Sequence, residues 1–269
     1  MTTSRSPFAL LVGLLGVIVV VIVGYPLLRT LGGVVADGST FGAAAHSVLT
    51  EPNLWPMLGN TAVVLGGSVA LAVVVAAVFA WLSERTTARL GWIAGVLPVV
   101  SLLVPSIAGA IGWVLLASPK AGFLNVALGD IGVPLTLDVF SFPGLIFVYT
   151  LYLVPQVYLP VSAALSELDP ALEEAARVSG RGPWRTFLTV TLPVVRPAIL
   201  SGALLALVYG IALFSVPLII GTQARIDILS VEIVRLLTTE FPPRLSEAIV
   251  LSVVVLLVLG VAWAGNSRV

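Results

Sequence analysis

The sequence predicts an all-α membrane protein with six transmembrane helices. Of its 269 residues, 59% are hydrophobic and only 10% are charged, with 13 basic and 13 acidic residues. An ordinary soluble domain is about 25% charged, so this composition excludes a soluble enzyme and a disordered chain. Six uncharged runs reach the roughly 20 residues that a helix needs to cross a bilayer: 6–28, 52–83, 90–119, 139–166, 197–224 and 248–267.

These runs place the six helices near 8–28, 58–82, 91–116, 141–164, 197–220 and 247–265. The first run resembles a signal peptide, but its apolar core is about 21 residues long and no Ala-x-Ala site follows closely. We therefore expect an uncleaved helix. Uninterrupted apolar runs argue against a β-barrel, whose strands alternate polar and apolar residues.

Three segments follow from this assignment. Residues 1–57 hold the first helix and an outer loop, residues 58–265 form a core of five transmembrane helices, and residues 266–269 are a C-terminal tail. With a cytoplasmic N-terminus, the inside segments carry eight of the basic residues and the outside segments five. This bias predicts that both termini and the loop 166–196 are cytoplasmic.

Several functional classes are excluded by what the chain lacks. It has no cysteine, one histidine (His46) and zero net charge, which argues against a metal site, a Ser-His-Asp triad and nucleic-acid binding. Its only lysine, Lys120, lies in Pro-Lys-Ala and cannot belong to a phosphate-binding loop. We therefore do not expect an enzyme.

No charged residue lies clearly at membrane depth. That observation disfavours a proton-coupled carrier and a voltage sensor, which need ionisable groups there. Weakly polar residues remain as candidates for lining a translocation path, although interhelical hydrogen bonding is the alternative for each of them. The candidates are Asn60, Ser106, Tyr149, Gln156, Tyr209 and Ser215.

The loop between the fourth and fifth helices predicts a helical hairpin. Asp169 is a suitable N-cap with proline after it, and Glu173 and Arg177 have the favourable i,i+4 spacing. Gly180 would cap the first helix in a left-handed conformation. A second short helix would follow and end at Pro193. The hairpin would either fold back on the bundle or bind a cytoplasmic partner.

This loop resembles the EAA loop of ABC importer permeases, whose pattern is Glu-Ala-Ala-x3-Gly-x9-Ile-x-Leu-Pro. The matching residues are Glu174, Ala175, Ala176, Gly180, Val190 (for Ile), Leu192 and Pro193. The resemblance implies the type I (MetI-like) permease fold, with this hairpin seated on an ATP-hydrolysing subunit. Glu174, Ala175, Ala176, Gly180, Leu192 and Pro193 would then couple the permease to the ATPase.

The same resemblance implies the partners. They are two ABC ATPase subunits that bind ATP and Mg, a second permease half, an external substrate-binding protein and the lipid of a bacterial inner membrane. The chain itself would hold no cofactor and bind no nucleic acid. It would be either a free-standing subunit or one half of a longer permease.

Residues 58–61 resemble the opening of the second helix of such permeases. The segments 118–125, 217–221 and 228–237 resemble the permeases for ferric iron, thiamine, polyamines or phosphonates. Two other classes remain as alternatives, a secondary carrier or channel and a non-transporting membrane scaffold. The segment 222–246 is too charged to cross the membrane and too apolar to lie free in solution, so we expect it to pack at the outer membrane surface. It would seal the bundle or bind the external protein, with Glu232 and Arg235 on one polar helix face.

Overall fold

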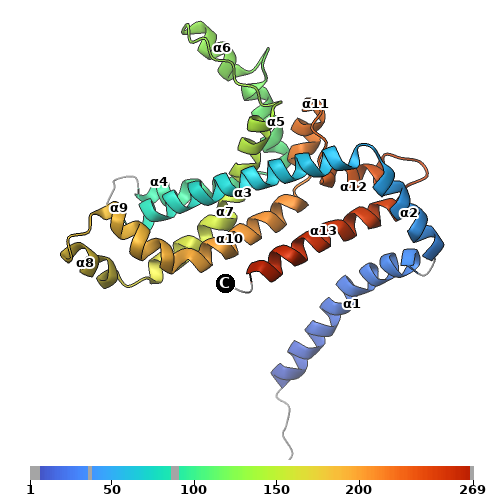
Figure 1. The fold of residues 1–269 in the computed structure, drawn as a ribbon, viewed down its shortest axis with the longest axis horizontal. Coiled ribbons are helices and arrows are strands. Elements are labelled where there is room, and N and C mark those ends of the chain that lie inside the picture. Colours follow the sequence, from blue (N-terminus) through green and yellow to red (C-terminus); the bar gives the residue numbers. More distant parts are fainter. Residues whose placement is uncertain (1–6, 36–37, 86–90, 267–269) are drawn as a thin grey trace, which may run out of the picture.

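The computed structural model describes residues 7–35, 38–85 and 91–266, and all its regular elements there are helical. Long helices lie side by side in a bundle, while α5 and α6 rise from one side and α1 leans away on the other (Figure 1). The long elements are α1 (Pro7–Val35), α3 (Leu54–Arg85), α7 (Phe142–Glu167), α10 (Leu192–Ala212) and α13 (Leu245–Asn266).

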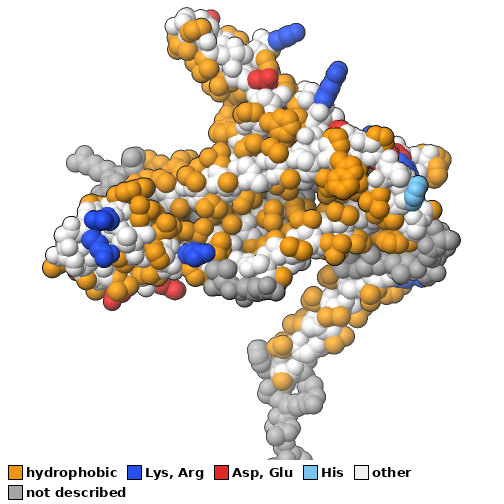
Figure 2. All heavy atoms as spheres, viewed as in Figure 1, with side chains coloured by type: hydrophobic (Ala, Val, Ile, Leu, Met, Phe, Trp, Pro, Cys, Tyr) orange, Lys and Arg blue, Asp and Glu red, His pale blue; other side chains and the backbone are white. Residues whose placement is uncertain are grey.

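Helix α7 forms the centre of the bundle and packs against both α3 and α10. In its most apolar stretch 61% of the residues are buried, against 22% to 28% in the other helices that are long enough to span. A helix that is apolar all round but mostly exposed within one chain has its solvent-facing side in lipid. Figure 2 shows hydrophobic side chains over most of the visible bundle, with charged ones toward its ends.

Four unbroken helical stretches among the described residues are long and apolar enough to cross a membrane: 54–85, 142–167, 183–212 and 245–266. A bent pair, Leu97–Leu103 with Ser106–Ala117, counts as a fifth only if its two helices form one span. In α1, which is 29 residues long, the apolar stretch found among the described residues is Leu11–Tyr25. The tail residues 267–269 and the basic residues Arg5, Arg89 and Arg268 lie outside the described residues.

The third predicted span, 91–116, is not one helix. It comprises α4 (Gly91–Val96), the 3₁₀-helix η1 (Leu97–Leu103) and α5 (Ser106–Ala117), with a bend of 111° between η1 and α5. Val104 is extended (φ −101°, ψ 117°) because it precedes Pro105, and a residue before proline is driven out of the helical region. Helix α6 (Phe123–Asp130) follows α5.

The fifth predicted span, 197–220, is also wrong at both ends. Its helix starts at Pro183 and stops at Ala212, where Leu213 turns extended. Pro217 has no N–H for the Leu213 carbonyl, so a continuous helix would leave that oxygen unpaired. The Tyr149 hydroxyl donates to it at 3.0 Å instead. The chain resumes with the π-helix η3 (Pro217–Gly221) and α11 (Thr222–Ala224).

Two further helices close one end of the bundle. Helix α2 (Gly38–Thr50) and α12 (Leu229–Thr238) both pack against α13. Leu229 and Leu236 of α12 are buried in a shared apolar cluster with residues of α2, α3 and α13. Within segment 222–246, α12 therefore packs on the bundle, while a position at the outer membrane surface stays a prediction.

Candidate functional site

The hairpin begins with the helix start that the sequence predicts. Helix α8 (Pro170–Val178) is capped by Asp169, whose carboxylate accepts a hydrogen bond from the Ala171 N–H at 2.9 Å. Pro170 occupies the first turn, where no N–H is needed. Glu173 and Arg177 are paired at 3.8 Å across one helical turn, as expected.

The turn of the hairpin depends on Gly180. Its φ is +80°, which confirms the predicted left-handed conformation. The Gly180 N–H donates to the Arg177 carbonyl at 2.9 Å, and the Arg181 N–H donates to the Ala176 carbonyl at 3.1 Å. These two bonds form a Schellman motif that satisfies carbonyls at the end of α8.

The second arm of the hairpin is not a separate short helix ended by Pro193, so that prediction is wrong. Helix α9 (Pro183–Thr186) runs through a π-helical turn, η2 (Phe187–Thr191), straight into α10. A proline ring clashes with the carbonyl four residues earlier. The wider π turn directly before Pro193 moves that carbonyl, so the helix continues past the proline.

The residues predicted to couple with an ATPase differ in exposure. Glu174, Ala175, Gly180 and Pro193 are exposed, and Leu192 is half-buried. Ala176 is only 8% exposed, so it packs within the hairpin and offers little surface to a partner.

Apolar side chains extend the exposed surface. They are Leu172 and Val178 on α8, with Trp184, which stacks on Phe187 with ring centroids 5.7 Å apart. Val178 is 90% exposed and Trp184 is 71% exposed. An exposed apolar patch of this kind marks an interaction surface.

The candidates for lining a translocation path come from several elements of the bundle. Tyr149 is buried and Ser215 half-buried, and both lie at the break after α10, where Tyr149 bonds the Leu213 carbonyl. Asn60 donates instead to the backbone carbonyl of Asp227 at 3.4 Å.

The remaining three candidates are spread over three helices. Ser106 is the first residue of α5, Gln156 is half-buried in α7, and Tyr209 is 36% exposed on α10. A role for any of the six in a path stays a prediction.

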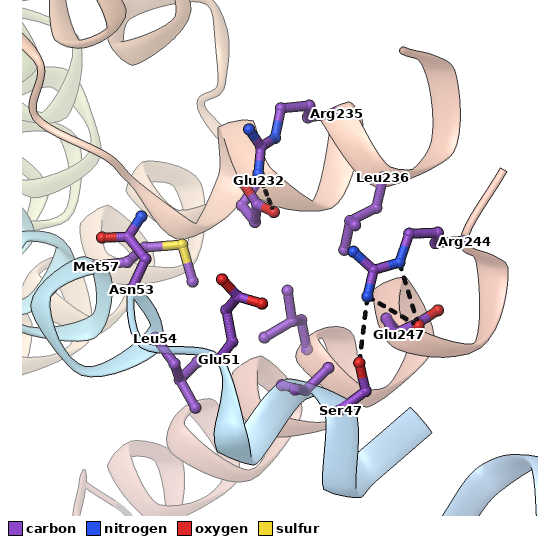
Figure 3. Close-up of a pocket in the computed structure, with 12 residues that line it drawn as sticks. Ser47, Glu51, Asn53, Leu54, Met57, Glu232, Arg235, Leu236, Arg244 and Glu247 are labelled. Atoms are coloured by element: carbon purple, nitrogen blue, oxygen red, sulfur yellow. Dashed lines mark hydrogen bonds and ion pairs between the residues drawn. The ribbon is translucent and has the colours of Figure 1, made fainter. Parts of the chain in front are cut away.

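A polar pocket of about 140 Å³ lies at the opposite end of the bundle from the hairpin, between α2, α12 and the start of α13 (Figures 1 and 3). Glu51 points into it, and Glu232 binds Arg235 at 2.8 Å, on one face of α12 as predicted. Arg244 bonds Glu247 at 3.0 Å and the Ser47 hydroxyl at 3.2 Å.

The charges in this pocket are fixed by their partners. The hydrogen bonds that the two guanidinium groups donate to Glu232 and to Glu247 raise the pKa of Arg235 and of Arg244, respectively, above the ordinary value. Both guanidinium groups therefore keep their charge at any physiological pH.

Sequence reasoning missed Arg85 and Thr191, which contact Glu173 beneath the hairpin. Arg85 was counted only as a basic loop residue, and Thr191 fell at a position the motif leaves free. Their partners are 88 and 18 positions away, so no local spacing could have paired them.

Residues 68–266 match the family described as binding-protein-dependent transport system inner membrane component. The chain is 23% identical over 211 residues to a ferric transport system permease protein of Haemophilus influenzae, covering 78% of this chain and 33% of that protein. It is 31% identical over 155 residues to a molybdenum transport system permease of Azotobacter vinelandii, covering 56% and 66%. It is 27% identical over 191 residues to a spermidine/putrescine transport system permease of Salmonella typhimurium, covering 70% and 66%.

The chain thus spans between one third and two thirds of the length of these relatives. Among solved structures, a chain of a bacterial ABC transporter involved in the import of the acidic polysaccharide alginate superposes with a TM-score of 0.79 at 20% identity. The match covers 97% of this chain and 96% of that one. It confirms the predicted fold class, the all-α fold of type I ABC importer permeases.

Proposed function

We propose that this chain is the transmembrane permease subunit of an ATP-driven ABC importer. The chain belongs to the family of binding-protein-dependent transport system inner membrane components. The observation that carries the proposal is the hairpin 170–193. Its first arm, α8, presents Glu174 and Ala175 to solvent beside exposed apolar side chains, and its second arm, which starts at Pro183, runs without a break into α10. The hairpin is therefore a surface for a soluble partner with a direct connection to the membrane span.

The proposed assembly contains two ABC ATPase subunits, which bind ATP and Mg, a second permease half and an external binding protein. Six helices alone form a thin wall, so two halves are needed to enclose a path. The chain lies in the inner membrane with both termini and the hairpin on the cytoplasmic side. The polar pocket around Glu51 and Glu232 is then on the outer side, where it serves the binding protein.

Transport depends on a difference between the two states of the permease in how well the hairpin fits the ATPases. ATP binding closes the paired ATPases, which hold the hairpin differently in the closed and the open state, and only such a difference can shift the permease between conformations. The interrupted spans, at Val104–Pro105 and at Leu213, are the points where helices tilt independently. The cavity between the two halves then changes from outward-open to inward-open.

We propose that the substrate is ferric iron, thiamine, a polyamine or a phosphonate. Two of the similar permeases are named for ferric and for spermidine/putrescine transport, and one is named for molybdenum. The path candidates carry no charge, so they do not select a bare cation or an anion. In this account the external binding protein makes most of the selection.

The test is to isolate the binding protein that associates with the chain and identify its bound ligand by mass spectrometry. That ligand is then offered to proteoliposomes holding the complete complex, with ATP inside or absent. The proposal predicts uptake only with ATP and the binding protein together. Uptake that proceeds at the same rate without ATP would instead identify a secondary carrier or channel.

A further inference from the structure

A cluster of buried polar groups lies at the base of the hairpin. The Thr191 hydroxyl donates to Glu173 Oε1 at 2.6 Å, and Arg85 Nε faces the same oxygen at 3.7 Å. The side chains of Arg85 and Glu173 are only 10% and 8% exposed, and Thr191 is fully buried. These residues come from the end of α3, from α8 and from the π turn that leads into α10.

Arg85 extends the cluster to a fourth segment. Its Nη2 donates to the carbonyls of Leu165 and Leu168, each at 2.7 Å. The Leu165 carbonyl lies in the last turn of α7 and the Leu168 carbonyl on the residue that follows it, where carbonyls lack partners within the helix and attract positive charge. Next to Arg85, Glu84 also accepts a hydrogen bond from Ser162 of α7 at 2.6 Å. The ends of α3 and α7 are therefore joined by charged groups.

Burial makes these contacts obligatory. A buried carboxylate without partners is strongly unfavourable, and breaking one partner of a buried pair costs far more than breaking an exposed pair. Arg177 also faces Glu173, but its side chain is 56% exposed, so water weakens that contact. Thr191 and Arg85 thus hold the Glu173 carboxylate in place, and Arg177 contributes little.

The covalent links of α8 to the rest of the chain are two short non-helical segments. One is the extended residue Leu168 after α7, and the other is the turn at Gly180. If only these links held α8, a force applied to its exposed face would bend the two loops and leave the spans where they are. A second, non-covalent attachment is needed for that force to reach α3, α7 and α10 together.

We propose that Arg85, Glu173 and Thr191 form a clasp that makes α8 move as one body with the cytoplasmic ends of α3 and α7 and with the start of α10. The three are positioning residues, which act through the hairpin and need not touch the ATPase. This inference rests on the proposed function, in which the hairpin receives the force. Its structural part, the attachment of α8 by the buried side chains, can be measured on the chain alone.

The first experiment uses hydrogen–deuterium exchange of the full chain in lipid nanodiscs. Thr191→Val removes the buried hydroxyl with little change in volume, and Thr189→Val is its control, because Thr189 is exposed in the same π turn and bonds Arg181. Loss of a hydrogen bond to a charged group shifts an opening equilibrium by about tenfold or more. We expect amide exchange in residues 172–178 to rise about tenfold in Thr191→Val and to stay unchanged in Thr189→Val. Equal exchange in the two variants overturns the clasp.

The second experiment measures the ratio of solute transported to ATP hydrolysed in the reconstituted complex. Thr191→Val and Glu173→Gln should keep the ATPase bound and its basal rate unchanged, while the ratio falls about tenfold. Arg177→Gln, which alters an exposed partner of the same carboxylate, should keep the wild-type ratio. A wild-type ratio in Thr191→Val, with the complex assembled, rejects the clasp but leaves the permease function standing. Failure of the wild-type chain to bind any ABC ATPase rejects the permease function. The hydrogen–deuterium exchange experiment then tests by itself whether the clasp attaches α8.

Discussion

Replacing Gly180 by valine tests the hairpin turn through backbone strain alone. A Cβ at this position would have no heavy atom within 4 Å, so the substitution creates no clash. The φ of +80° is the source of the penalty, because a left-handed conformation costs a residue with a side chain roughly 1–2 kcal/mol, and a β-branched one at least the upper value. About 2 kcal/mol corresponds to a shift of roughly thirtyfold in the population of the native turn.

The strain is relieved only if the chain leaves the left-handed region. That movement breaks the bonds from the Gly180 and Arg181 N–H groups to the carbonyls of Arg177 and Ala176. Helix α8 then loses its fixed angle to the second arm. We expect Gly180→Val to reduce solute uptake about tenfold or more in reconstituted complexes. Basal ATPase activity and thermal stability should stay close to wild type, because the affected turn is exposed.

Two variants make this experiment specific. Gly182→Val places the same side chain two residues away, where φ is −68°, ψ is 163° and the space is also open, so it should behave as wild type. Gly180→Asn should recover part of the uptake, because asparagine tolerates the left-handed region. Normal uptake by a correctly assembled Gly180→Val complex would refute the reasoning.

Other predictions concern packing, topology and the outer pocket. Gly202→Ala should destabilise the chain by about 1–3 kcal/mol in thermal unfolding, because its Cβ would lie 2.9 Å from the Val157 Cα, whereas Gly66→Ala meets open space and should not. Ser179→Cys, in a chain without natural cysteine, should react with membrane-impermeant maleimide only after the cells are opened, and labelling of intact cells would invert the topology. Exchanging Glu232 with Arg235 preserves an exposed pair worth less than about 1 kcal/mol, so the fold should hold while stimulation by the binding protein is lost. Unchanged stimulation would leave α12 with a sealing role only.

The features that sequence reasoning predicted correctly are local ones. The Asp169 cap, the Glu173–Arg177 pair and the left-handed Gly180 each depend on residues within a few positions of one another. Their energetics are those of a single helix end, which the same spacing produces in most surroundings. The apolar runs also indicate membrane-spanning segments from the sequence alone, because the length of a span is set by the thickness of the bilayer.

The wrong predictions concern positions where an irregular helical turn or a contact distant in sequence decides the structure. Pro193 was interpreted as the end of a helix, but the π turn before it relieves the clash and the helix continues. Leu213 interrupts an uncharged span four residues before Pro217, and the Tyr149 hydroxyl that satisfies its carbonyl is 64 positions away. Ala176 belongs to the motif but is buried under the hairpin, because Glu173 on the same helix is held inward by Arg85 and Thr191.

The central claim is that the hairpin 170–193 binds an ABC ATPase, and co-purification tests it most directly. The wild-type chain, Glu174→Arg and Glu51→Arg are each extracted from the membrane with their partners, and the ABC ATPase recovered per permease chain is quantified by mass spectrometry. Glu174 is exposed on α8, while Glu51 is exposed at the opposite end of the bundle and serves as the control for insertion and folding. We expect one ATPase per permease chain for wild type and Glu51→Arg, and a large loss for Glu174→Arg. Equal recovery in all three, or no ABC ATPase with the wild-type chain, would contradict it.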